Sequence, residues 1–453
     1  MNTTQKYYIK TFGCQMNVYD SHRIAHILDS LGYEAASSTR NADIIIFNTC
    51  HIREKAAEKV FSDLGRALLI KKERAAEGKD TIIGVTGCVV QAEDEQIAVR
   101  APYVDFATGP LTYHRLPEIL EKVKRARGES IIDTEFPAES KFDFLPENKS
   151  SGGCSFLAIQ EGCNNFCTYC VVPYTRGVET SRSVEEVISE ARHLVNSGSV
   201  ELNLLGQNVN SYHGTDQNGQ ERSLAYLLRK LAEIDGLKRI RYTTSYPADM
   251  TDELIACHKD LPQLMPYLHL PVQSGSDKIL KAMNRRHSRD DYLRTIEKLY
   301  AANPALRMSS DFIVGFPGET DEDFEQTLDI VKRVGYIQAF SFKYSKRPGT
   351  PASLMPDQVE EKIKQQRLDI LQDLLSSYQL KFNEETIGKT MPVLFEFKGR
   401  HSGQLVGRTP YMQNVHVNIG KEYLNRIVDI KITEATVNSL TGIYPAETQS
   451  KKG

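Results

Sequence analysis

The segment EGCNNFCTYC, residues 161–170, decides how this sequence is interpreted, because it holds three cysteines in the spacing C-x3-C-x2-C. It begins at the end of the β-rich run FLAIQEG, residues 156–162. Three thiolates this close together can hold one iron–sulfur cluster or one zinc ion. A structural zinc ion needs a fourth ligand, and the nearest candidate, Cys154, precedes the predicted strand. A four-iron cluster on three thiolates leaves one iron open to a small molecule, which favours a catalytic site.

Five further β-rich runs follow this segment, and helical patterns such as residues 184–196 and 290–302 lie between them. Six β/α units predict an incomplete parallel barrel, in which the loops after the strands form the active site. The five runs are residues 201–207, 240–245, 267–273, 308–316 and 340–345. The loops after them carry Gly206-Gln207-Asn208, Ser245-Tyr246-Pro247, Gln273-Ser274-Gly275 and residues 315–319.

The first third of the chain has its own strand–helix pattern, which predicts an open parallel α/β sheet. Its β-rich runs are YYIKTF, ADIIIFNT and TIIGVTG, and helix-compatible stretches such as residues 21–31 and 54–74 follow them. Cys14, Cys50 and Cys88 each lie within about two residues of a strand end, where open α/β sheets bind ligands. We therefore expect the three to share a metal site. The alternative is that they are small buried apolar residues.

Composition limits the class of protein. The chain has 453 residues, with 56 Lys and Arg against 59 Asp and Glu, and 40% of its residues are hydrophobic. Disordered and collagen-like classes are excluded, and the length predicts two or three domains. No stretch resembles a membrane helix, and residues 1–10 lack the apolar run of a signal peptide. We expect a cytoplasmic protein without a membrane partner, whose cysteines are ligands rather than disulfides.

The remainder of the chain is predicted to form a connector and a small all-β domain. A long helix, residues 358 to about 384, leads into short strands separated by glycines. From residue 381 onward the chain has ten basic and seven acidic residues, which suits an oligonucleotide, although a structural cap is the alternative. The predicted boundaries are 1–127 for the N-terminal domain, 128–152 for the connector, 153–380 for the barrel, 381–446 for the β domain and 447–453 for a tail.

Residues 161–170 resemble the signature of the radical S-adenosylmethionine (SAM) enzymes. The resemblance implies that Cys163, Cys167 and Cys170 ligate a 4Fe-4S cluster, whose open iron is chelated by SAM. In that superfamily the cluster cleaves SAM to a 5′-deoxyadenosyl radical.

The resemblance also implies which residues contact SAM. The backbone around Tyr169 is expected to contact the adenine, and Gly206 and Gln207 to approach the methionine. For Gln207 and Asn208, capping of a helix is the alternative. The other residues predicted to bind the cofactor are Ser245, Gln273 and Gly315.

Nearly the whole chain resembles the methylthiotransferases, within them the branch that modifies isopentenyladenosine in tRNA. The resemblance implies a second 4Fe-4S cluster on Cys14, Cys50 and Cys88, and a C-terminal TRAM domain. Two departures from the family pattern are visible: GCVVQ stands at residues 87–91 in place of GCMAQ, and Tyr246 stands where His is common. The motifs that carry the resemblance are TFGCQMNVYDS, NTCHIREKA, CNNFCTYCVVPYTRG, LLGQNVNSY, HLPVQSGS, DFIVGFPGET and RPGTPA.

The implied reaction places a methylthio group on carbon 2 of N(6)-isopentenyladenosine at position 37 of tRNA, next to the anticodon. That aromatic C–H is neither acidic nor electrophilic, so acid–base and nucleophilic catalysis offer no route and a radical is needed. The resemblance implies two SAM molecules: one methylates a sulfur held by the second cluster, and the other supplies the radical. Cys154 and Cys257 are then spare thiols.

The expected partners are the tRNA anticodon stem-loop, a flavodoxin- or ferredoxin-type electron donor, and a sulfur donor or iron–sulfur carrier, with the chain acting as a monomer. Arg285, Arg286 and Arg347 supply positive charge near the barrel loops, which suits phosphates, although solvated helix ends are the alternative.

Two other functions stay open. One is a related methylthiotransferase acting on threonylcarbamoyl-adenosine in tRNA or on an aspartate of a ribosomal protein. The other is a non-enzymatic tRNA-binding or iron–sulfur carrier protein.

Overall fold

A computed structural model describes residues 4–50, 54–126, 128–150 and 152–445. The chain forms two compact units. The first comprises residues 1–149 with two short later segments, 161–164 and 171–179, and the second comprises the rest. The predicted tail, residues 447–453, lies outside the described residues.

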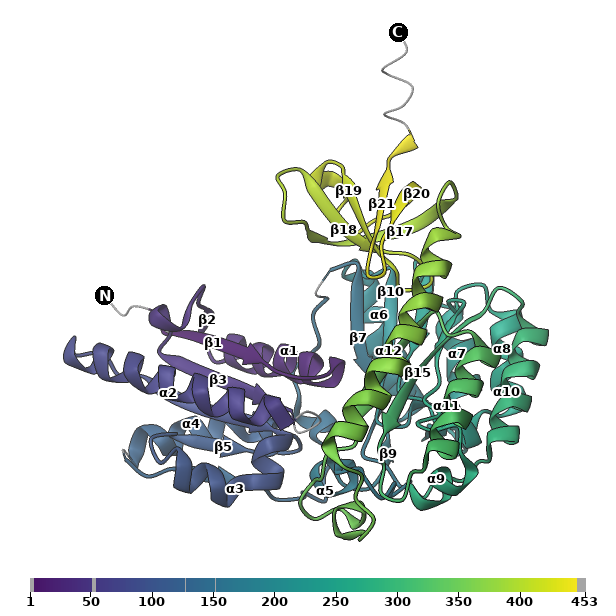
Figure 1. The fold of residues 1–453 in the computed structure, drawn as a ribbon. Coiled ribbons are helices and arrows are strands. Elements are labelled where there is room, and N and C mark those ends of the chain that lie inside the picture. The colour runs from purple at the N-terminus through teal and green to yellow at the C-terminus, as the bar shows by residue number, and fades with distance from the viewer. Residues whose placement is uncertain (1–3, 51–53, 127, 151, 446–453) are drawn as a thin grey trace. The chain divides into compact units, whose positions relative to one another are not determined.

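The first unit is built on a six-stranded, wholly parallel sheet in the order β2-β1-β3-β4-β5-β6 (Figure 1). Alternate side chains of β3 enter two apolar clusters: Ile45 and Phe47 pack with α2, and Ile44 and Ile46 pack with α1 and α4. Helices therefore cover both faces, as a buried parallel sheet requires. The strands are β1 (Lys6–Thr11), β2 (Glu34–Ala35), β3 (Ile44–Thr49), β4 (Ile82–Gly87), β5 (Phe106–Thr108) and β6 (Ile131–Asp133). The helices are α1 (Gln15–Ser30), α2 (Glu54–Ala76), α3 (Cys88–Arg100) and α4 (Leu116–Arg125).

The open parallel sheet expected from the sequence is confirmed, and the stretch expected to be a connector contributes to it. Ile131–Asp133 forms the edge strand β6, paired with β5. Lys141, from the same stretch, is 3% exposed. Residues 128–152 are therefore in part integral to the first unit rather than a free linker.

The second unit begins with six parallel strands in two three-stranded sheets, β13-β10-β7 and β14-β15-β16. Six β/α units were expected, and the helix predicted at residues 184–196 is α6 at those bounds. One large apolar cluster fills the space between strands and helices. The strands are β7 (Cys154–Ala158), β10 (Glu201–Leu205), β13 (Arg239–Tyr242), β14 (Tyr267–His269), β15 (Arg307–Val314) and β16 (Gln338–Lys343). The helices are α6 (Val184–Asn196), α7 (Leu224–Ala232), α8 (Asp252–Asp260), α9 (Asp277–Ala282), α10 (Arg289–Ala302) and α11 (Asp321–Val334).

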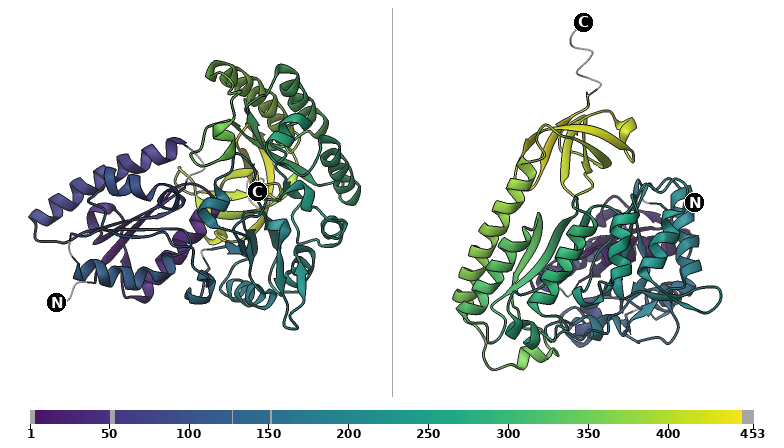
Figure 2. Two further views of the ribbon diagram at one scale, coloured as in Figure 1. Left: turned by 90° about the horizontal axis from the view of Figure 1, so that it is seen from below. Right: turned by 90° about the vertical axis from the view of Figure 1, so that its right-hand side faces the viewer.

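The same unit ends in a closed five-stranded barrel, β17-β18-β19-β21-β20, to which the long helix α12 (Glu361–Glu384) leads (Figure 2). The all-β domain expected from the sequence is confirmed. Its last strand, β21 (Leu440–Ile443), was not predicted. The other strands are β17 (Thr390–Lys398), β18 (Gln404–Arg408), β19 (Asn414–Asn418) and β20 (Ile427–Ala435).

Short elements occupy the loops of the chain. They are β8 (Gln160–Glu161), α5 (Val172–Arg176), β9 (Thr180–Ser181), β11 (His213–Thr215) and β12 (Glu221–Ser223). Among the described residues, no helix is long and apolar enough to cross a membrane.

Asp323 in the first turn of α11 is expected to be a major local stabiliser. Its carboxylate accepts bonds from Ser276 (2.6 Å), Lys278 (2.8 Å) and the Thr320 backbone N–H (2.9 Å). Burial alone would raise its pKa, but the Lys278 and Ser276 bonds outweigh burial and lower the pKa to about 2. Because this lies below the unfolded value, the stabilisation is complete above about pH 4 and is lost as the pH falls toward 2.

We predict that Asp323→Asn lowers the free energy of unfolding by roughly 1–2 kcal/mol at pH 7, through the lost ion pair and weakened cap. Thermal unfolding under anaerobic conditions measures this. Asp321→Asn, on the same turn but 91% exposed, is the matched control and should change stability little. Equal losses in the two variants would contradict the assignment.

Candidate functional site

The three N-terminal cysteines lie at the carboxyl edge of neighbouring strands. Cys14 caps α1 after β1, Cys50 directly follows β3, and Cys88 is the first residue of α3 after β4. Gly13 makes this approach possible: its φ is +105°, and an added Cβ would lie 2.1 Å from the Cβ of Cys50.

Cys14 interacts with both other thiols, and Arg176 acts on Cys14 and Cys88. A side-chain hydrogen bond with Cys50 lowers the pKa of Cys14 to about 6; burial opposes this shift and the positive charge of Arg176 adds to it. Burial raises the pKa of Cys88, and the charge of Arg176 opposes that rise. Cys88 and Cys14 also act on each other electrostatically. The structure thus brings the predicted trio together.

The donor set fits an iron–sulfur cluster better than a single ion. Within the described ranges, no three His, Cys, Asp or Glu side chains could hold one metal ion between them. A four-iron cubane is wider than one ion, so its thiolates need not converge on one point. Three largely buried thiols with a fixed cation beside them provide the ligand type that such a cluster requires.

A buried set of four charges adjoins these cysteines, and no sequence pattern indicates it. Arg176 donates to Asp20 at 2.7 Å and to Glu161 at 2.5 Å. Lys141 pairs with the same two carboxylates, at 3.2 Å and 2.7 Å. All four side chains are at most 5% exposed. The charges of Lys141 and Arg176 outweigh burial and hold the pKa of Asp20 below its ordinary value.

The central cysteines lie in a loop held by backbone hydrogen bonds. The Cys163 N–H donates to the Gly177 carbonyl at 3.2 Å, and the Cys170 N–H donates to the Cys167 carbonyl at 2.9 Å. Arg285 donates to the Cys167 sulfur at 3.7 Å. The backbone amides of Cys163 and Cys170 are thus both hydrogen-bonded.

Polar atoms at the carboxyl ends of the first barrel strands are left for a ligand. Among the described residues, Gln160 Oε1, Asn208 Oδ1 and Ser245 Oγ are buried without a hydrogen-bond partner. Such atoms are costly unless something binds them. The lack of a Cβ at Gly206 lets the Gln160 side chain lie against its backbone, since an added Cβ would lie 2.7 Å from Gln160 Oε1. These residues fit a polar cofactor such as SAM.

The alternative for Asn208, capping of a helix, finds no support. Asn208 precedes the 3-10 turn Val209–Ser211 but makes no side-chain cap bond there. Its amide donates instead to Asp249 at 2.8 Å. Gln207, beside it, is half-buried.

Tyr169, Gln273 and Gly315 are the other predicted SAM residues in the second unit. The Tyr169 ring packs edge-on against Phe316 at 6.4 Å, and burial raises its pKa well above the ordinary value. Gln273 and Gly315, just beyond β14 and at the end of β15, both have positive φ, +73° and +69°. The Gly315 N–H donates to Glu319 at 2.8 Å.

Of the arginines expected to contact RNA, Arg285 is turned inward. Its guanidinium bonds the Pro271 carbonyl at 2.6 Å and lies 4.2 Å from the centre of the Tyr246 ring. Arg286 is exposed and pairs with Asp249 at 3.0 Å. Arg347 is half-buried in the turn after β16.

The departures from the family pattern affect packing. Val89 and Val90 of GCVVQ are buried in the core of the first unit. Tyr246, which stands where His is common, accepts the backbone N–H of Arg286 at 2.7 Å. The spare thiols take part in neither site: Cys154 begins β7 and donates to Glu201 at 3.7 Å, and Cys257 is buried in the barrel core.

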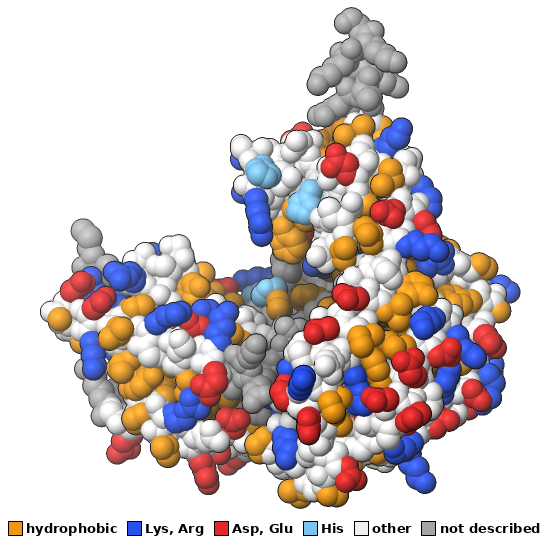
Figure 3. Space-filling model, viewed as in Figure 1, with side chains coloured by type: hydrophobic (Ala, Val, Ile, Leu, Met, Phe, Trp, Pro, Cys, Tyr) orange, Lys and Arg blue, Asp and Glu red, His pale blue; other side chains and the backbone are white. Residues whose placement is uncertain are grey.

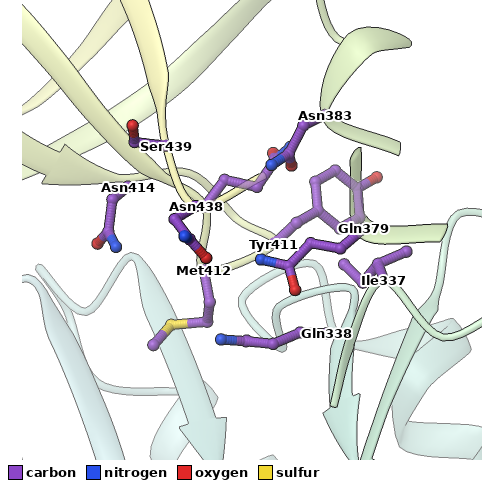
Figure 4. A pocket seen from close by; sticks show the side chains of 10 residues that line it. Ile337, Gln338, Gln379, Asn383, Tyr411, Met412, Asn414, Asn438 and Ser439 are labelled. Carbon is purple, nitrogen blue, oxygen red and sulfur yellow. The ribbon is translucent and has the colours of Figure 1, made fainter. Parts of the chain in front are cut away.

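Two pockets lie elsewhere in the second unit. Figure 4 shows the smaller, about 40 Å³, between α12 and the small barrel. Its amides are already bonded, as between Gln413 and Asn383 at 2.8 Å, and its volume suits water rather than a cofactor. The larger, about 390 Å³, is bordered by Arg286, Arg294 and Lys298, each paired with an aspartate.

Comparison with known proteins gives consistent matches. Models of the radical SAM superfamily, of the uncharacterized protein family UPF0004 and of the TRAM domain match residues 157–331, 6–109 and 384–444. The chain is 55% identical over 442 residues to the tRNA-2-methylthio-N(6)-dimethylallyladenosine synthase of Rickettsia canadensis (strain McKiel), covering 97% of this chain and 99% of that protein.

Solved structures resemble the chain in fold. The radical SAM methyltransferase TsrM from Kitasatospora setae, solved with cobalamin and a [4Fe-4S] cluster, has a TM-score of 0.56 at 12% identity, covering 78% of this chain and 77% of that one. The cobalamin-dependent SAM radical enzyme OxsB has a TM-score of 0.51 at 13% identity, covering 83% and 56%.

We predict that Gly13→Ala displaces Cys50 and removes the iron bound by the N-terminal cysteines, leaving about four irons per chain on the central cysteines. Iron and sulfide analysis after anaerobic reconstitution measures this. Gly32→Ala is the matched control, because Gly32 also has positive φ (+83°) but an added Cβ would meet nothing within 4 Å. Equal iron loss in both variants would attribute the effect to backbone strain alone.

Proposed function

The chain belongs to the tRNA-2-methylthio-N(6)-dimethylallyladenosine synthase family of radical SAM methylthiotransferases, and on that premise we propose that it places a methylthio group on carbon 2 of N(6)-isopentenyladenosine in tRNA. The observation that carries the proposal is the pair of cysteine trios, each at the carboxyl ends of parallel strands. Its cofactors are SAM and two 4Fe-4S clusters.

The six ligand cysteines form two separate cluster sites. Cys163, Cys167 and Cys170 hold one cluster, and Cys14, Cys50 and Cys88 hold the other. Bound by Cys163, Cys167 and Cys170, a four-iron cluster with an open iron would supply the reductive cleavage of SAM, which is the radical chemistry that an unactivated aromatic C–H requires.

Residues at the barrel's strand ends bind and orient SAM. Asn208 and Ser245 offer it unpartnered polar atoms, and the backbone at Gly206 approaches its methionine part. The backbone at Gln207, Gln273, Gly315 and beside Tyr169 completes this cofactor site.

The tRNA contacts rest on local charge. On the face drawn in Figure 3, acidic and basic side chains are interspersed over the barrel helices, so no broad basic surface guides RNA there. Arg286 and Arg347 remain the proposed phosphate contacts, with the TRAM barrel as a further RNA-binding module. Arg285 makes a poorer phosphate contact, because its guanidinium bonds Pro271 and Cys167.

The cellular setting is also a proposal. We infer a cytoplasmic monomer that receives electrons from a flavodoxin- or ferredoxin-type donor and sulfur from a separate donor or iron–sulfur carrier. A target other than isopentenyladenosine, such as threonylcarbamoyl-adenosine or a ribosomal-protein aspartate, is disfavoured by the 55% identity to the Rickettsia enzyme.

We predict that anaerobically purified protein carries about eight irons, four for each cysteine trio. Cys163→Ala should abolish formation of 5′-deoxyadenosine from SAM and dithionite, because it removes a ligand of the SAM-binding cluster. Cys50→Ala should retain part of that cleavage but form no methylthio product. Cys257→Ala is the control and should behave as wild type. About four irons in fully reconstituted wild type would contradict the two-cluster proposal.

The substrate is tested with two anticodon stem-loops that differ only in the isopentenyl group. We expect anaerobic enzyme to add a methylthio group to the isopentenylated stem-loop alone, as read by nucleoside mass spectrometry. Unchanged methylthio-isopentenyladenosine in tRNA from a deletion strain would reject this substrate. Absence of 5′-deoxyadenosine from a fully loaded protein would favour a carrier.

A further inference from the structure

Arg176 is a buried arginine beside the N-terminal cysteine trio. It is 3% exposed and ends the short helix α5, six residues beyond Cys170. One of its nitrogens bonds Glu161, which lies two residues before Cys163, so this ion pair closes the base of the central cysteine loop. Its other terminal nitrogen bonds Asp20 at 2.7 Å and Asn17 Oδ1 at 3.3 Å.

The second nitrogen faces the N-terminal trio. The Cys14 thiol donates to the same Asn17 oxygen at 3.5 Å, so Asn17 bridges Cys14 and Arg176. The charge of Arg176 acts on Cys14 and on Cys88, and Asp20 acts on both with the opposite sign.

The charges of the buried set are balanced but unevenly placed. Two cations, Arg176 and Lys141, face two carboxylates, so the set is neutral as a whole. Lys141 bonds Asp20, Glu161 and the Pro110 carbonyl, whereas Arg176 also bonds Asn17 and acts on Cys14 and Cys88. An arginine stays protonated in proteins, so this charge is permanent. Charge beside a cluster is one of the factors that set its reduction potential.

We propose that Arg176 is a positioning residue of the N-terminal cluster. Its permanent positive charge beside Cys14 and Cys88 raises the reduction potential of the cluster, and the negative charge of Asp20 lowers that potential. The inference rests on the proposed function, because it requires a cluster on Cys14, Cys50 and Cys88. A positive charge stabilises the more negative, reduced cluster, whereas a carboxylate stabilises the oxidised one. The potential of the site is then set by residues that ligate no iron.

The test isolates the N-terminal cluster in the full-length chain by replacing Cys163, Cys167 and Cys170 with Ala. After anaerobic reconstitution, EPR-monitored potentiometry gives the midpoint potential. We expect Arg176→Gln to shift it negative, Asp20→Asn to shift it positive, and Arg176→Lys, which keeps the charge, to stay near the parent. Both neutral variants break the same Arg176–Asp20 ion pair, so a structural disturbance would shift the midpoint potential in the same direction in both. Shifts of opposite sign therefore indicate an electrostatic effect.

The control is Arg74→Gln, which removes a largely buried arginine paired with Asp43 at 2.5 Å, before the amino end of β3 and so away from the cysteine edge. It should leave the potential unchanged. Shifts of the same sign in Arg176→Gln and Asp20→Asn, or no shift in either, overturn the proposal. If Arg176→Gln fails to bind the cluster, cluster binding by Arg176→Lys would support the role of the positive charge. Loss of the cluster from both variants would overturn the proposal. A parent protein that binds no iron rejects the two-cluster function itself.

Discussion

The carboxyl ends of parallel strands all lie at one edge of their sheet, and both cysteine sites depend on this constraint. In the N-terminal sheet, β1, β3 and β4 are hydrogen-bonded neighbours, so residues just beyond their ends are close although they lie 36 and 38 positions apart. In the barrel, the same rule places Gly206, Ser245 and Gln273 in the loops after successive strands. The N-terminal trio needs three neighbouring strand ends and a close approach between them, which the positive φ and missing Cβ of Gly13 allow for Cys50.

Patterns local in the sequence predicted most of the fold. The six barrel strands were visible as β-rich runs, and α6 was predicted at its observed bounds from its helical pattern; the structure adds a capping box at Ser183 that fixes its start. Polar or short elements were missed: β6 lies in a stretch rich in Pro, Ser and charge, and β21 has four residues. Such strands form because a neighbouring strand pairs with them, and the composition of a segment does not indicate that pairing.

The candidate site shows the same difference between features that are local in the sequence and features that depend on distant residues. The cysteines could be found because spacing and strand ends are sequence features, and their clusters followed from chemistry and family resemblance. The buried charges could not be found in this way, because Asp20 and Arg176 are 156 positions apart. A lysine in a polar stretch, such as Lys141, is also expected to have a solvated side chain, whereas Lys141 is buried. The inward turn of Arg285 is equally invisible, since Arg286 beside it has the same chemistry and faces solvent.

The buried ion pairs also affect how the chain is made. Asp20 belongs to α1, whereas its partners Lys141 and Arg176 are synthesised more than a hundred residues later. Until they arrive, burying its carboxylate costs several kcal/mol. The N-terminal unit includes residues 161–164 and 171–179, so it cannot finish folding before translation has entered the barrel. We therefore expect the N-terminal unit to complete its contacts only after the loop that carries the central cysteines has been synthesised.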